Sequence, residues 1–168
     1  MTAAAAIRFT ILGQPCSKAN TRSIVTVGRG TDHQRPAVIK SKAALAYERD
    51  ALRQIPPSAR QRLQGPVRVT IRIWYRTELP DLDASVILDC LQDRWAKRPT
   101  ADPRRPPAER ALAQAGVYRN DRQVRELHLF HAIDAANPRA DICVEPITLQ
   151  QALLGPLHDS LTASPSLL

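Results

Sequence analysis

Apolar and polar residues alternate along several stretches of the chain, as they do in strands with one buried face. The alternation is clearest over residues 67–73, where valines and isoleucines alternate with Arg68, Thr70 and Arg72. This stretch predicts a strand with one apolar and one cationic face. Asn137-Pro138 predicts a hairpin turn between the last two strands. Strands are predicted over residues 6–12, 23–27, 38–39, 67–73, 126–133 and 140–144.

Two segments have helical rather than strand-like spacing. Ser41 is a good helix N-cap, and the apolar residues that follow recur at helical intervals until Pro56-Pro57. The segment 84–91 predicts a second, shorter helix. The order of elements predicts an α/β (α+β) fold, a single small domain whose mixed β-sheet carries helices on one face.

We expect one domain over residues 1–147. Within it, residues 93–115 are rich in arginine and proline and predict an inserted loop. The C-terminal tail, residues 148–168, has little periodicity and predicts either a docked helical turn or a frayed end.

The charge balance narrows the classes of partner. The chain has 168 residues with 24 Lys plus Arg against 16 Asp plus Glu, a net charge of +8. Such a surface favours nucleic acid or an anionic membrane, although a composition biased toward Arg, Ala and Pro gives the same balance. Three isolated cysteines predict neither a zinc site nor a disulfide framework. No signal peptide or apolar membrane span is present in the pattern, so we expect a cytoplasmic protein without membrane contact.

The candidate chemistry lies in three aspartates. Asp81 and Asp83 are two residues apart, and in an extended segment their carboxylates point the same way and can share Mg²⁺. An isolated D-x-D is better explained by Asp83 acting as the cap of the following helix, and the metal site gains support only from its combination with Asp121. Asp121, between two extended segments, is by itself typical of a turn.

These pieces occur in an order that resembles the RusA type of Holliday-junction endonucleases, which are common in phages and prophages. The resemblance spans about residues 6–147 and includes Gly13-Gln-Pro before Lys18, the cationic strand, Asp81-Leu-Asp83, Leu88-Asp89-Cys90-Leu91, and Asn120-Asp121-Arg-Gln-Val124. It implies a homodimer that cuts four-way DNA junctions with magnesium, held by Asp81, Asp83 and Asp121.

The chain departs from the family pattern at two places beside the D-x-D. The usual asparagine is Ala84, and the family's helix lysine finds only Val86 and Ile87. Lys18 or the Lys97-Arg98 segment could supply that charge. Basic residues would hold the DNA phosphates, and each of them could equally be a solvated surface residue. The candidates are Lys18, Arg22, Arg72, Arg76, Arg119 and Arg122.

Three functions therefore compete. The first is a Mg²⁺-dependent, structure-selective endonuclease that resolves Holliday junctions. The second is a catalytically weak or inactive protein that binds branched DNA on the same scaffold. The third is an interaction domain whose basic balance is only compositional. Asp89 is expected to lie at the surface or at a helix end, and Trp74, Tyr75 and Trp95 to serve packing or to stack on unpaired bases.

Overall fold

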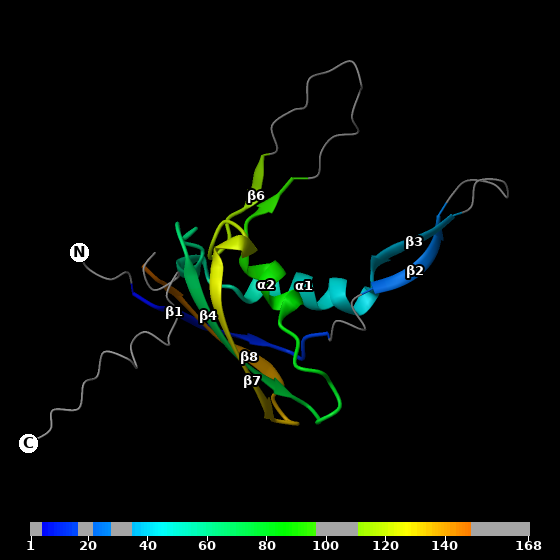
Figure 1. Cartoon of the computed structure of the whole chain (residues 1–168). Helices are drawn as coiled ribbons and strands as arrows, with labels where there is room; N and C mark the ends of the chain where they lie inside the picture. The colour runs from blue at the N-terminus through cyan, green and yellow to red at the C-terminus, as the bar shows by residue number, and fades with distance from the viewer. Residues whose placement is uncertain (1–4, 17–21, 28–34, 97–110, 149–168) are drawn as a thin grey trace, which may run out of the picture.

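The computed structural model describes residues 5–16, 22–27, 35–96 and 111–148. Its elements follow the predicted order closely (Figure 1). They are β1 (Ile7–Leu12), β2 (Arg22–Val27), β3 (Arg35–Lys40), α1 (Lys42–Gln54), η2 (Pro57–Ala59), β4 (Val67–Tyr75), α2 (Ser85–Leu91), β5 (Arg94–Trp95), β6 (Leu112–Gln114), η3 (Asp121–Gln123), β7 (Val124–Ile133) and β8 (Arg139–Pro146). The predicted class, a small α+β domain, is confirmed.

The main sheet has four strands in the order β1-β8-β4-β7. β4 pairs in parallel with β7 on one side and antiparallel with β8 on the other. The predicted hairpin between β7 and β8 is therefore wrong, because β4 lies between them. The turn after β7 instead crosses the end of β4, where the Asp134 N–H donates to the Tyr75 carbonyl over 2.9 Å.

β4 is central because one of its faces is wholly apolar. Its odd-numbered residues from Val67 to Tyr75 are fully buried, while Arg72 is exposed and Arg68, Thr70 and Trp74 are half-buried. The predicted apolar and cationic faces are confirmed. The apolar face packs on α1 and α2, which lie together on one side of the sheet (Figure 1).

α1 begins as its sequence predicts. The Ser41 hydroxyl oxygen accepts a hydrogen bond from the Ala44 N–H over 3.2 Å, and the helix ends at Gln54, before Pro56 and Pro57. Its buried face includes Ala44, Tyr47, Glu48 and Ala51. No helix in the described part of the chain is long and apolar enough to cross a membrane.

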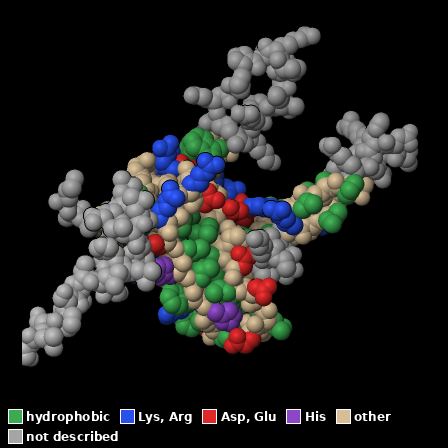
Figure 2. All heavy atoms as spheres, viewed as in Figure 1, with side chains coloured by type: hydrophobic (Ala, Val, Ile, Leu, Met, Phe, Trp, Pro, Cys, Tyr) green, Lys and Arg blue, Asp and Glu red, His purple; other side chains and the backbone are tan. Residues whose placement is uncertain are grey.

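Two small antiparallel ribbons stand outside the main sheet. β2 and β3 pair over six residues each and project beyond the start of α1 (Figure 1). β5 and β6 pair at the described ends of the predicted loop 93–115. Residues 97–110 of that loop, which include Lys97 and Arg98, and residues 149–168 of the predicted tail lie outside the described residues. In the same view, acidic and basic side chains lie side by side near α2 and the base of the β2–β3 ribbon (Figure 2).

Candidate functional site

The turn that carries Asp81 and Asp83 is built around one hydroxyl group. The side chain of Tyr75, the last residue of β4, is fully buried and reaches this turn. Its hydroxyl donates to the Asp81 carbonyl over 3.0 Å and accepts from the Asp83 N–H over 3.3 Å. One buried group therefore fixes the backbone of both aspartates.

Only one of the two Asp83 carboxylate oxygens has a hydrogen-bond partner among the described residues. Asp83 Oδ1 accepts a hydrogen bond over 2.9 Å from the N–H of Ser85, the first residue of α2. Asp83 Oδ2 is buried and has no hydrogen-bond partner among the residues that the structure describes. The cap explanation thus accounts for one oxygen, although Ala84 is the N-cap residue. A buried carboxylate oxygen without a partner is costly, so it is an observation that calls for a ligand or another explanation.

Both carboxylates act electrostatically on the same hydroxyl. Burial raises the pKa of Tyr75, the hydrogen bond from the Asp83 N–H opposes this rise, and the negative charges of Asp83 and Asp81 add smaller contributions that raise the pKa. Tyr75 therefore stays protonated and neutral at physiological pH. Its hydroxyl keeps a proton to donate to the Asp81 carbonyl.

Asp81 opens onto a cavity of about 790 Å³. Arg22, at the start of β2, lines the same cavity, so the fold brings a predicted metal ligand and a predicted phosphate-binding residue together. Arg76 lies close by, because its N–H donates to Gln14 Oε1 over 2.9 Å. Lys18 falls outside the described residues. The cavity is lined by Gln14, Pro15, Cys16, Arg22, Ser23, Ser41, Ala43, Leu79, Pro80 and Asp81.

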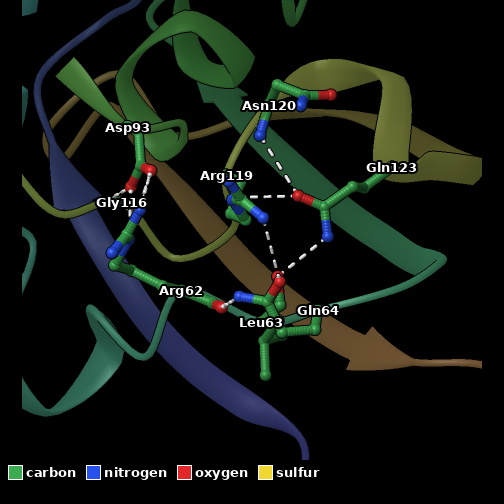
Figure 3. A network of polar contacts seen from close by, with 8 residues as sticks. All are labelled: Arg62, Leu63, Gln64, Asp93, Gly116, Arg119, Asn120 and Gln123. Carbon is green, nitrogen blue, oxygen red and sulfur yellow. Dashed lines mark hydrogen bonds and ion pairs between the residues drawn. The ribbon is translucent and has the colours of Figure 1, made fainter. Parts of the chain in front are cut away.

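Asp121 lies in a different turn, at the first residue of η3. Hydrogen bonds of the flanking Asn120 and Gln123 side chains close this turn, and those of Gln123 are drawn in Figure 3. The Asn120 side chain accepts from the Arg122 N–H over 3.1 Å. The Gln123 side chain accepts from the Arg119 and Asn120 N–H groups over 2.7 and 3.2 Å, which completes a capping box. Asp121 itself is exposed.

The Gln123 amide also ties this turn to the start of β4. It donates to the Leu63 carbonyl over 2.8 Å (Figure 3) and to the Gly65 carbonyl over 2.7 Å. Asp93 links two segments beside this turn. Its fully buried carboxylate accepts hydrogen bonds from the Arg62 side chain and from the Gly116 N–H. A Cβ on Gly116 would lie 2.4 Å from the Gln92 carbonyl carbon, so only glycine fits there.

The two turns are anchored to different ends of β4. Asp121 precedes Val124, which pairs with the first residue of β4, whereas Asp81 is held by the last residue of that strand. Among the described residues, no group of three or more His, Cys, Asp or Glu side chains could hold a metal ion. The expected convergence of all three aspartates is thus not seen in the described part of one chain, and a metal-binding role for Asp121 stays a prediction.

The remaining predicted DNA contacts are divided between two places. Arg72 points away from the helices, on the open face of the sheet, with its guanidinium over the Trp74 and Phe130 rings. Arg119 and Arg122 are exposed beside Asp121. Neither group lines the cavity at Asp81.

The missing helix lysine is explained by packing. Val86 and Ile87 occupy its expected place, and both are buried in the hydrophobic core together with Ala84. No side chain of the first turn of α2 therefore offers a positive charge to the aspartate pair. Such a charge has to come from another element, and Arg22 is the described residue that shares the cavity.

A charged cluster on α1, α2 and the two ribbons was not predicted. Lys40 Nζ lies 2.9 Å from Glu48 and 3.4 Å from Asp89, and Arg94 also pairs with Glu48. Burial alone would raise the pKa of Glu48, but the hydrogen bonds from Lys40 and Arg94 hold it below its usual value. The sequence did contain a signal, since Glu48 stands four residues from Ala44 and from Leu52, on the apolar face of the predicted helix.

Comparison with known proteins identifies no family for this chain, so any functional assignment rests on its own residues. No family model matches the chain, and no curated protein matches it.

Proposed function

We propose that this protein is a Mg²⁺-dependent, structure-selective DNA endonuclease of the RusA type, which resolves Holliday junctions by phosphodiester hydrolysis. The observation that carries the proposal is the unpartnered, buried Oδ2 of Asp83, in a turn that also presents Asp81 to a cavity shared with Arg22. A carboxylate pair next to a cavity that also contains an arginine suits a metal ion on one side and a phosphate on the other.

The residues present fit magnesium. Mg²⁺ is usually held by one or two carboxylates, with water and phosphate oxygens as its other ligands. Asp81 is exposed and Asp83 has a free oxygen, so the pair offers the required donors without a third aspartate. A bound magnesium ion would lower the pKa of a water ligand and offset charge on the phosphate.

The chain's own residues would position the DNA. Arg22 can hold a backbone phosphate at the cavity, and Arg76 stands at its edge through the hydrogen bond to Gln14. Tyr75 keeps the two carboxylates in place while its hydroxyl stays neutral. Two symmetric cuts in a four-way junction require two active sites, so we propose a homodimer as the working unit.

The test is cleavage of a four-way junction with Mg²⁺ by the wild-type protein and by aspartate variants. We expect Asp81→Asn and Asp83→Asn each to lower the cleavage rate at least about 100-fold, the scale of losing a principal electrostatic contribution. Asp50→Asn is the matched control, because this exposed aspartate of α1 lies outside the cavity. Cleavage that survives Asp81→Asn would remove the proposed site.

The Asp121→Asn variant tests whether Asp121 belongs to the metal site, as the family resemblance implies, or lies outside it, as the geometry of one chain indicates. The pair at Asp81 and Asp83 acts alone if this variant keeps its rate within about tenfold of wild type, which is the smaller effect of changing a more distant charge. A loss as large as that of Asp81→Asn would mean that Asp121 belongs to the same metal site, as the resemblance implies.

A branched-DNA-binding protein without effective catalysis is the second candidate. The specific observation that favours it is the buried position of Val86 and Ile87, which leaves the aspartate pair without a cation from α2. A gel-shift assay on the same junction distinguishes the two. Salt-dependent binding without cleavage would support the binder, and absence of binding at low salt would exclude both candidates.

A further inference from the structure

The open face of the sheet carries a row of alternating cations and aromatic rings. Arg139 lies over the Trp74 ring at 4.3 Å, and Arg72 lies 5.9 Å from the Trp74 centroid and 5.5 Å from that of Phe130. The strand register explains the row, because Trp74 pairs with Arg139 on β8 and Arg72 pairs with Phe130 on β7. The row therefore crosses three strands on the side away from α1 and α2.

Arg72 differs from the other arginines of this row and its surroundings. Arg139 donates to Asp134 and to the Asn137 carbonyl, and Arg8 lies 4.0 Å from Glu145. The Arg72 side chain has no hydrogen bond or ion pair with any residue that the structure describes. Two rings hold its guanidinium while its N–H groups remain available, an arrangement suited to a phosphate.

A pocket of about 430 Å³ lies beside this guanidinium. Phe130 forms part of it and is 44% exposed, so one aromatic surface is open to a ligand. Asp141 also lines it, but its carboxylate already accepts hydrogen bonds from the Thr10 hydroxyl and from Trp74 Nε1. The pocket volume falls in the range of sites for single small ligands. It is lined by Arg8, Phe9, Thr10, Thr70, Arg72, Phe130, Asp141, Ile142 and Cys143.

We infer that this pocket binds one nucleotide of a single DNA strand, with its phosphate on Arg72 and its base stacked on Phe130. The class of ligand, DNA, rests on the proposed function, but the site requires neither Asp81 nor metal. A single strand fits better than a duplex, because only unpaired bases offer a free face for stacking. The site would hold an unpaired strand next to the junction.

A second copy of the chain is a poorer occupant of this face. The carboxylates on the face are already engaged within their own chain. Glu126 pairs with Arg68, Asp141 accepts from Thr10 and Trp74, and Glu145 lies near Arg8. An identical face would therefore bring no unpaired anion to Arg72, whereas every nucleotide of a DNA strand brings one.

Tryptophan fluorescence tests the inference directly. The chain has two tryptophans, Trp74 and Trp95, so a Trp95→Phe background leaves only the one in the row. Titration with a short oligothymidylate in EDTA should quench Trp74 to saturation. In this background, Arg72→Gln and Phe130→Leu should each weaken binding about tenfold. Arg72→Gln should also lower the slope of log affinity against log salt by about 0.7.

The matched control is Arg53→Gln, which removes an exposed arginine from α1, on the other side of the sheet, and should leave the titration unchanged. Equal weakening by Arg53→Gln and Arg72→Gln, or the absence of quenching, would overturn the inference. Self-association that Phe130→Ala abolishes, with no quenching by the oligonucleotide, would overturn it in favour of a second copy. Junction cleavage without quenching removes this site alone, and quenching without cleavage removes the nuclease proposal alone.

Discussion

The turns that carry Asp121 and Asp81 are anchored to different ends of β4. They differ in how many of their polar atoms have hydrogen-bond partners. In the turn at Asp121, Asn120 and Gln123 satisfy the neighbouring backbone groups, and Gln123 makes four hydrogen bonds. In the turn at Asp81, Tyr75 fixes the backbone, but Asp83 keeps a buried oxygen without a partner. The backbone of the first turn is held by its own side chains, whereas the second turn leaves a buried oxygen unpaired among the described residues, and a buried polar atom of that kind requires an explanation.

The largest expected effect is a loss of stability near the start of β4, where Asp93 pairs with Arg62. Asp93→Asn should lower the free energy of unfolding by about 3 kcal/mol, because it removes the buried charge that holds Arg62 and the Gly116 N–H. Urea denaturation followed by circular dichroism measures this change. Asp83→Asn, at the other end of β4, should change stability by less than about 1 kcal/mol. Equal destabilisation by the two variants would remove the distinction between the ends.

Magnesium should stabilise the protein through the end that carries Asp83. At about 100 times its dissociation constant, a ligand that binds only the folded state adds about 2.7 kcal/mol. Thermal unfolding with and without Mg²⁺ should show a shift for wild type and for Asp121→Asn, and none for Asp83→Asn. A shift that disappears only in Asp121→Asn would place the metal at the other turn.

Tyr75→Phe should have an intermediate effect. It leaves the Asp81 carbonyl and the Asp83 N–H without their shared partner, at a cost of about 1–2 kcal/mol. Junction cleavage should fall about tenfold, because loss of positioning costs less than loss of a ligand. Leu79→Ala, which truncates an exposed side chain nearby, is the comparison for stability. An unchanged cleavage rate would mean that the hydroxyl does not position the carboxylates.

The smallest effect is expected from Gln123→Ala. Water can replace part of what the exposed capping turn loses, so the free energy of unfolding should fall by about 1 kcal/mol. Mg²⁺ should still stabilise this variant by the wild-type amount in the same thermal assay. Loss of the magnesium effect would show that the two turns communicate along β4.

Local structure was largely predictable because it depends on neighbouring residues. The Ser41 cap, the stop before Pro56 and the two faces of β4 all follow from short-range sequence patterns. The order of strands did not follow. Asn137-Pro138 marks a turn correctly, but a turn does not reveal whether the flanking strands pair with each other or on either side of a third.

The candidate site was predictable only in part, for the same reason. Asp81 and Asp83 are close in sequence, so their shared turn could be anticipated. The position of Asp121 depends on the register of β7 against β4, which no local pattern specifies. Glu48, Lys40, Asp89 and Arg94 meet only because α1, α2 and the ribbons pack together.

The central place of β4 also determines when the sheet can form. Both of its partners, β7 and β8, follow it by some 50 residues or more, and β1 pairs only with β8. While the chain is being synthesised, β4 has no partner strand along either edge until the residues of β7 emerge. β1 has none until Arg139–Pro146 is synthesised. Such distant pairings predict slow folding and an interval in which the nascent chain is open to aggregation or chaperone capture.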